Sequence, residues 1–209
     1  MTTSNIFNSD ITIIFEGITG SGKSTQAKLI ADYLSHSSSV RYLDTGKIYP
    51  IIEPLRPANP ETVIEIVQES LFFQFMNWMR FRNREHYNIT IVDRFLLSNC
   101  VYTLEKMHRL GIQHNPEEVR STILNPFGLD PLQQTFTLYL DCPVELAQER
   151  TVQRQRNRFN MEEQSKVREL YRQEIKRYPH CVKIIDGSAD SKTVHSETVE
   201  SLELILTKL

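Results

Sequence analysis

FEGITGSGKSTQ, residues 15–26, is the stretch of this sequence that decides the fold. It contains the pattern G-x-x-x-x-G-K-[ST], which is typical of a loop that binds phosphate groups. The β-branched and apolar run ITIIF, residues 11–15, predicts a buried strand before the loop. Apolar residues at helical spacing over 24–34 predict a helix after it. Strand, glycine turn and helix in this order are the context that the pattern requires.

The glycines of this loop predict a site for a nucleoside triphosphate. They let successive backbone N–H groups point into one nest that accepts phosphate oxygens, and the helix N-terminus adds its positive dipole. We expect Lys23 to stand in this exposed nest and to reach the β- and γ-phosphates of ATP. The hydroxyl of Ser24 is expected to ligate Mg²⁺.

The rest of the chain alternates between strand patterns and helix patterns. Further apolar runs predict strands at 40–44, 89–93, 135–141 and 182–187. This alternation predicts an α/β fold of the P-loop NTPase type, with three layers, α/β/α, around a parallel sheet. Because the sequence shows no repeat and no linker, residues 1–209 are expected to form one domain.

Composition and charge predict a cytoplasmic protein without nucleic-acid or membrane partners. The formal net charge is −2, so no global basic field favours nucleic acid. No apolar run approaches the ~18 residues of a membrane span. The N-terminal segment MTTSNIFNSD lacks the charged and apolar regions of a signal peptide. The three cysteines are widely separated and lack metal-ligand spacing, as expected for reduced intracellular thiols.

Asp93 and Arg94 stand at the end of the predicted strand 89–93. The carboxyl edge of an open parallel sheet is where ligands bind. A carboxylate there can hold Mg²⁺ or take a proton from the phosphoryl acceptor, and an adjacent arginine can clamp a phosphate bidentately. The alternative is a strand-end ion pair without chemistry.

ERTVQRQRNRF carries four arginines, Arg150, Arg154, Arg156 and Arg158. The last three are spaced by two residues and cannot share one helical face, so we expect a loop to interrupt the helix. Arginines on such a lid, at about 150–165, could close over the phosphates and neutralise charge in the transition state. The alternative is a solvated basic face.

SLFFQFMNW, residues 70–78, mixes large aromatic side chains with two amides, Gln74 and Asn77. Large apolar residues at helical spacing are usually core. One aromatic side chain with a nearby amide could instead stack on a nucleobase and read its edge. Both interpretations stay open.

Taken in order, these segments resemble the thymidylate kinase family of P-loop nucleoside monophosphate kinases. FEGITGSGKSTQ is similar to the phosphate loop of that family, and DRFLLSNCVY resembles its D-R-[YF]-x-x-S-x-x-x-[YF] segment. LYLDCPVELAQER and RFNMEE resemble the two ends of its lid. KVRELYRQEI and VKIIDGSADSKTVHSE resemble its C-terminal helix, strand and adenine-side loop.

The resemblance implies an activity and an assembly. The activity is ATP- and Mg²⁺-dependent phosphoryl transfer to a pyrimidine (deoxy)nucleoside monophosphate, with dTMP first, giving the diphosphate and ADP. The assembly is a homodimer. Because residues 18–21 contain no arginine, the resemblance also implies that the catalytic arginines act from the lid, at Arg154 and Arg158.

Motif and resemblance together assign roles to named residues. The catalytic group is Lys23, Asp93, Arg94, Arg154 and Arg158. The nucleotide-binding group is Gly17, Thr19, Gly20, Ser21, Gly22, Lys23, Ser24, Thr25 and Arg150, the last near the adenine. The acceptor-binding group is Glu53, Phe73, Gln74, Asn77, Arg94, Ser98 and Tyr102, with Phe73 stacked on the pyrimidine. The Mg²⁺ ligands are Ser24 and Asp93.

The chain departs from the family pattern on the acceptor side. Thr19 stands where the family usually has a loop acidic residue, and Asn77 where an arginine usually reads the base edge. Thr103 follows Tyr102 where glutamine is common. The segment T-R-E-P-G-G is reduced to IIEPLRP, which keeps Glu53. These departures leave the acceptor base open.

Two alternative functions remain. Phe73 and Gln74 are similar to the base-contacting FQ pair of deoxynucleoside kinases, whose general base would be Glu53 here. Their E-R-S motif, however, is D-R-F in this chain. The other alternative is a nucleotide-binding relative with a different acceptor or without catalysis.

Overall fold

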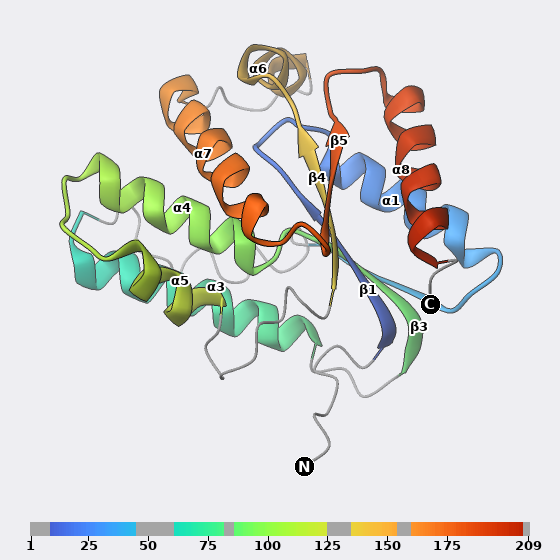
Figure 1. Ribbon diagram of the computed structural model, residues 1–209, viewed down its shortest axis with the longest axis horizontal. Coiled ribbons are helices and arrows are strands. Elements are labelled where there is room, and N and C mark those ends of the chain that lie inside the picture. The colour runs from blue at the N-terminus through green and yellow to red at the C-terminus, as the bar shows by residue number, and fades with distance from the viewer. Residues whose placement is uncertain (1–8, 45–60, 82–85, 125–134, 154–159, 207–209) are drawn as a thin grey trace.

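A computed structural model describes the protein over most of its length (Figure 1), namely residues 9–44, 61–81, 86–124, 135–153 and 160–206. In chain order, its strands and α-helices are β1 (Ser9–Glu16), α1 (Lys23–Ser35), β2 (Val40–Leu43), α3 (Val63–Phe81), β3 (Tyr87–Asp93), α4 (Leu96–Arg109), α5 (Pro116–Leu124), β4 (Phe136–Asp141), α6 (Val144–Gln153), α7 (Met161–Glu174), β5 (Val182–Asp186) and α8 (Ser191–Leu206). A short 3₁₀ turn, Ile175–Arg177, follows α7.

The five strands form one parallel sheet in the order β2-β3-β1-β4-β5. Strand β1 is central. The next two strands in the chain, β2 and β3, lie on one side of it, and the last two, β4 and β5, lie on the other. Phe15 of β1 lies opposite Asp93 of β3 and Leu138 of β4. The carboxyl ends of these strands therefore meet at the point where the strand order reverses, which is where ligands bind in open α/β sheets.

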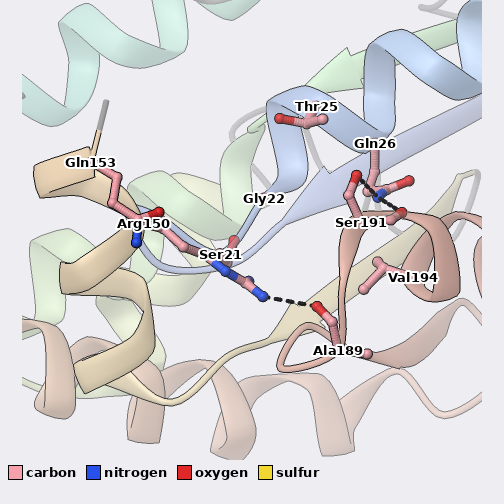
Figure 2. Close-up of a pocket in the computed structure, with 9 residues that line it drawn as sticks. All are labelled: Ser21, Gly22, Thr25, Gln26, Arg150, Gln153, Ala189, Ser191 and Val194. Atoms are coloured by element: carbon pink, nitrogen blue, oxygen red, sulfur yellow. Dashed lines mark hydrogen bonds between the residues drawn. The ribbon is translucent and has the colours of Figure 1, made fainter. Parts of the chain in front are cut away.

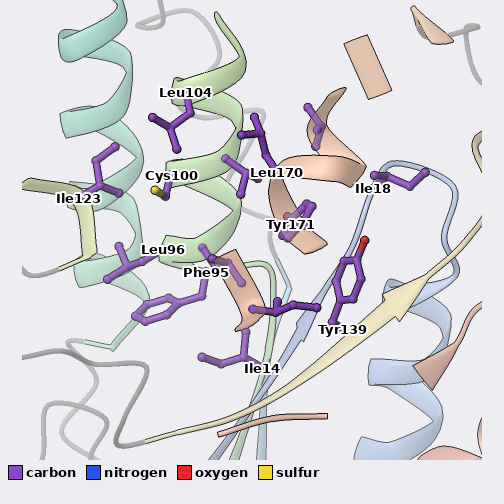
Figure 3. Close-up of a cluster of buried hydrophobic side chains, with 14 of the residues drawn as sticks. Ile14, Ile18, Phe95, Leu96, Cys100, Leu104, Ile123, Tyr139, Leu170 and Tyr171 are labelled. Atoms are coloured by element: carbon purple, nitrogen blue, oxygen red, sulfur yellow. The ribbon is translucent and has the colours of Figure 1, made fainter. Parts of the chain in front are cut away.

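Helices cover both faces of the sheet, as the three-layer prediction requires (Figure 1). Successive side chains of a strand point to opposite faces. Ile13 and Phe15 accordingly pack with α1 and α8, whereas Ile14 packs with the group of α4 and α7. Figure 3 shows this second core, where Leu104 of α4 and Tyr171 of α7 lie among buried neighbours. Both cores are formed by alternating apolar residues of the same strands.

The predicted strands and the predicted helix after the phosphate loop are all present, within a few residues of their expected bounds, and helices separate the later strands as the alternation predicts. Helix α5 was not predicted. Its start nevertheless has a sequence signal, because Pro116 occupies the first turn and the side chain of Asn115 accepts the backbone N–H of Glu117 at 3.0 Å. Among the described helices, none is both long and apolar enough to cross a membrane.

Candidate active site

The phosphate loop, residues 17–24, joins β1 to α1 and is packed tightly against its neighbours. Gly20 has a φ of +83°, and a Cβ atom there would lie 2.2 Å from the carbonyl oxygen of Ala147. Gly22, at the N-cap of α1, has a φ of +96°. Both positions favour glycine because of their left-handed backbone, and Gly20 in addition has no room for a side chain. A side chain at Gly20 would collide with α6, so glycine is what lets the loop lie against that helix.

The N-terminus of α1 carries no compensating negative charge. Its N-cap, Gly22, makes no side-chain hydrogen bond, and its first turn contains no acidic residue. The positive end of the helix dipole therefore faces the phosphate loop without a compensating charge from the first turn. Ser24 and Thr25 belong to this turn. The local electrostatics fit the phosphate groups of ATP.

Lys23 is buried, which corrects the expectation of an exposed lysine. Only 6% of its surface is exposed, and its Nζ donates to the carbonyl oxygen of Ile18 at 3.1 Å. A buried ammonium group needs such an acceptor because an unpaired charge is costly in the interior. The side chain therefore folds back across the phosphate loop instead of extending into solvent.

A cavity of about 140 Å³ lies beside the phosphate loop, between α1, α6 and the segment after β5 (Figure 2). Its walls are tied together by hydrogen bonds. Arg150 of α6 donates to the carbonyl oxygens of Gly187 and Ala189 at 2.6 and 2.8 Å. Gln26 of α1 donates to the carbonyl oxygen of Ser191 at 2.9 Å. Arg150 thus borders the space expected for the adenine, while its guanidinium holds the segment that forms the opposite wall.

Arg94 lies at the other end of the phosphate loop in a strained backbone conformation. Its φ is +62°, in the left-handed region that a residue with a side chain rarely adopts, and its N–H donates to Phe15 O at 3.0 Å. Such strain persists only where surrounding structure enforces it, and it is frequent at functional sites. The turn aims the guanidinium of Arg94 back toward the phosphate loop.

Three other predicted site residues meet at this guanidinium. Arg94 donates from Nη1 to Ser98 Oγ at 3.1 Å and from Nη2 to Thr19 Oγ1 at 3.4 Å. The guanidinium carbon lies 5.4 Å from the ring centroid of Tyr102, a cation–π distance. Burial lowers the pKa of Arg94, but the surrounding acidic groups, of which Tyr102 has the largest effect, raise it more. The net pKa lies above its ordinary value, so the guanidinium stays cationic. Thr19 thus faces the predicted acceptor side, and its role in nucleotide binding stays a prediction.

Beneath Arg94 lies a fully buried carboxylate that the sequence analysis did not single out. Oε1 of Glu16 accepts the backbone N–H groups of Phe95 and Ser98 at 2.9 and 3.1 Å. Oε2 accepts the hydroxyl of Ser98 and, at 3.0 Å, the hydroxyl of Tyr171. Burial raises the pKa of Glu16, while the hydrogen bonds and Arg94 lower it in part. Burial also raises the pKa of Tyr171 well above its usual value, so the phenol stays a donor.

Helix α7 contributes a second residue that sequence reasoning missed. Oε1 of the buried Gln164 accepts the backbone N–H of Thr19 at 3.2 Å and the hydroxyl of Tyr102 at 3.1 Å. One amide oxygen thus joins the phosphate loop to the predicted acceptor side. An acidic residue ending the apolar run ITIIFE was a usable signal for Glu16, whereas Gln164 sits in a polar helix without any.

Ser24 and Asp93 carry the oxygen ligands that Mg²⁺ prefers. Ser24 lies in the first turn of α1, and Asp93 is the buried last residue of β3. Mg²⁺ at a phosphate site usually takes one or two protein oxygens and completes its octahedron with phosphates and water. The donor set therefore fits the ion.

Three of the residues assigned to the acceptor base lie on α3. Phe73 is half-buried and packs edge-on against Phe72, with ring centroids 6.4 Å apart. Asn77 is buried. Gln74 donates to the carbonyl oxygen of Thr122 in α5 at 3.3 Å, so its amide contacts a neighbouring helix. Their contacts with a base stay predictions.

Glu53, Arg154 and Arg158 lie outside the described residues. The general-base role of Glu53 and the lid roles of the two arginines therefore stay predictions from the sequence.

Comparison with known proteins adds to this geometry. The family model for thymidylate kinase matches residues 82–198. A thymidylate kinase of Kosmotoga olearia is 29% identical over 217 residues, which cover 94% of this chain and 97% of that protein. A thymidylate kinase of Clostridium novyi is 30% identical over 202 residues, which cover 88% of this chain and 94% of that protein.

Solved structures show the same fold. Thymidylate kinase from Ehrlichia chaffeensis is similar with a TM-score of 0.63 and 22% identity, over 93% of this chain and 99% of that one. Deoxyadenosine kinase from M. mycoides, solved with dCMP and dCDP, has a TM-score of 0.70 and 18% identity, over 93% of this chain and 100% of that one. At these identities the likeness concerns the fold and does not separate the two activities.

Proposed function

Because the chain belongs to the thymidylate kinase family and is a nucleotide phosphotransferase, we propose that it phosphorylates a pyrimidine nucleoside monophosphate with ATP. dTMP is the first acceptor to expect, and the products are the nucleoside diphosphate and ADP. We propose further that residues 1–209 act as one domain in the cytoplasm, and that Arg154 and Arg158 act from a lid.

The observation that carries the proposal is the placement of Arg94. Its guanidinium lies beside Thr19 of the phosphate loop, and neither Arg94 nor Thr19 lines the cavity that Arg150 borders in Figure 2. A guanidinium at that position suits an acceptor that carries a phosphate group, because arginine can donate two parallel hydrogen bonds to a phosphate. A nucleoside without a phosphate would give this group nothing to hold.

In this reaction the protein supplies position and charge. Phosphoryl transfer asks for little covalent help, so alignment and electrostatic stabilisation dominate catalysis. The phosphate loop and Lys23 hold the donor phosphates, and Arg94 holds the acceptor phosphate. Bound Mg²⁺, for which Ser24 and Asp93 are the candidate ligands, supplies further neutralisation of negative charge on the phosphates.

The test is ADP release, measured by an enzyme-coupled assay over a panel of nucleosides and nucleoside monophosphates. We expect turnover with a pyrimidine monophosphate, dTMP first, and little with unphosphorylated nucleosides. A preference for a nucleoside would support the deoxynucleoside kinase alternative. Nucleotide binding without ADP release over the whole panel would contradict the proposal and point to another acceptor.

We also propose that two copies pair through α3. Its outer face exposes Ile64, Val67, Leu71 and Phe75, which follow each other at spacings of three and four residues. They form one apolar stripe along the helix, here called the α3 stripe. Contiguous exposed apolar surface marks interaction sites, and a stripe on a helix can meet its own copy across a two-fold axis. The partner proposed is a second copy of this chain.

Leu71→Glu is expected to convert the dimer to a monomer, because it places a charge in the middle of the α3 stripe. The matched control is Leu204→Glu on α8. Leu204 is an exposed leucine like Leu71, with 64% of its surface exposed against 50% for Leu71, but it does not belong to the α3 stripe. Sedimentation velocity at micromolar concentration gives the mass of each variant. A wild-type monomer, or a Leu71→Glu variant that stays dimeric, would contradict the pairing.

A further inference from the structure

Helix α4 starts without a cap of its own. Phe95 at its N-cap makes no side-chain hydrogen bond, and its first turn contains no acidic residue. The missing acceptor comes from another element, because Glu16 at the end of β1 accepts the N–H groups of Phe95 and Ser98. A carboxylate at a helix N-terminus is stabilised by the dipole as well as by the hydrogen bonds. Glu16 therefore fixes the chain immediately after Arg94.

The same carboxylate is linked to the guanidinium of Arg94 through one hydroxyl. Arg94 Nη1 donates to Ser98 Oγ at 3.1 Å, and Ser98 Oγ in turn donates to Oε2 of Glu16. A second hydrogen-bond acceptor of the guanidinium, Thr19 Oγ1, is neutral. Charge-assisted hydrogen bonds are stronger and more directional than neutral ones. A guanidinium held in this way has less freedom to turn away from a bound phosphate.

A buried carboxylate must itself be held in place, and α7 does this. Tyr171 donates to Oε2 of Glu16 at 3.0 Å and lies 2.6 Å from Ser98 Oγ. Tyr171 is fully buried in the core that Figure 3 shows. Glu16 thus has partners on α4 and α7, and its position is set from both sides.

We propose that Glu16 is a positioning residue for acceptor binding: through Ser98 and the first turn of α4, it holds Arg94 where the acceptor phosphate binds. This inference rests on the proposed function and deepens it. Glu16 does not touch the acceptor. Its effect on acceptor binding passes through Arg94, because Glu16 holds both the backbone of the next residue, Phe95, and the Ser98 hydroxyl that accepts from the guanidinium.

The test is Glu16→Gln, which keeps the shape of the side chain and removes its charge. We expect KM for the acceptor monophosphate to rise at least about tenfold, which is about 1.4 kcal/mol. The dissociation constant for ATP, measured by calorimetry without acceptor, is expected to change less than about twofold. A purely structural role would instead lower the melting temperature and the active fraction, and hence kcat, with KM unchanged.

A double-mutant cycle shows whether Glu16 acts through Arg94. On an Arg94→Ala background, Glu16→Gln is expected to have no further effect on kcat/KM for the acceptor, since interacting residues are not additive. The matched control is Glu174→Gln, which removes another buried carboxylate, one that is paired with Arg120 away from the site. It is expected to lower stability without raising the acceptor KM.

The outcomes separate this inference from the proposed function. If the wild type is active but Glu16→Gln leaves the acceptor KM unchanged, the inference is wrong and the proposed function stands. The same holds if the effects of Glu16→Gln and Arg94→Ala on kcat/KM are additive. A wild type that turns over no nucleoside monophosphate would overturn the proposed function, and this inference with it. If Glu16→Gln does not fold, Tyr171→Phe carries the same test, because it removes a hydroxyl that holds the Glu16 carboxylate and Tyr171 is not among the residues assigned to the acceptor.

Discussion

Lys23→Ala is expected to abolish phosphoryl transfer, leaving less than about a tenth of the wild-type kcat. Lys23 begins α1 at the phosphate loop, and we expect its ammonium group to neutralise charge on the β- and γ-phosphates when ATP binds. Charge neutralisation is most of what a protein contributes to this chemistry, so its loss acts on the transition state. The measurement is kcat by coupled ADP release at saturating ATP and acceptor.

The fold of this variant must be checked, since Lys23 is buried and donates to the carbonyl oxygen of Ile18. Thermal melting shows whether the loss of that hydrogen bond matters for stability. The matched control is Lys28→Ala, an exposed lysine of the same helix, which is expected to keep wild-type kcat. A folded Lys23→Ala variant with more than about a tenth of wild-type kcat would contradict the assignment of the phosphate loop.

Arg94→Ala is expected to lower kcat/KM for the acceptor monophosphate at least about 30-fold, with ATP affinity nearly unchanged. Truncating one partner of a desolvated charge pair costs about 2–5 kcal/mol, and tenfold corresponds to about 1.4 kcal/mol. Two of the groups that accept hydrogen bonds from Arg94, the hydroxyls of Thr19 and Ser98, are neutral, and we expect the guanidinium to add a charge-assisted contact to the acceptor phosphate. The matched control is Arg109→Ala, an exposed arginine at the end of α4, the helix that follows Arg94.

Glu53→Gln, measured on the same best acceptor, separates the two kinase activities. If the acceptor is a monophosphate, Arg94→Ala is the more damaging change, because the phosphate loses its clamp. If the acceptor is a nucleoside, Glu53 would take the proton of the attacking hydroxyl, and Glu53→Gln is the more damaging change. A wild type that prefers a nucleoside and suffers more from Glu53→Gln would contradict a monophosphate kinase.

Local patterns predicted those parts of the molecule whose conformation depends on neighbours in sequence. The glycine spacing and its flanking strand and helix appear as β1, the phosphate loop and α1. The apolar run before Asp93 appears as β3, and it delivers Asp93 and Arg94 to the edge of the sheet. Helix α4 ends just before Gly111, which has a φ of +65°. In each case the signal lies within one short segment of sequence: the spacing of the apolar residues, a turn residue or a helix cap.

The sequence by itself therefore determined the fold class, the phosphate loop and the position of Arg94 at the end of a strand. Only the tertiary structure decided what surrounds that arginine. Glu16 and Tyr171 are 155 residues apart in the chain, and Thr19 and Gln164 are 145 apart, yet each pair shares a hydrogen bond. Side-chain periodicity records which face of an element is buried, but not which element that face meets. The partners depend on strand order and on the packing of α4 and α7 over the sheet, which no local pattern contains.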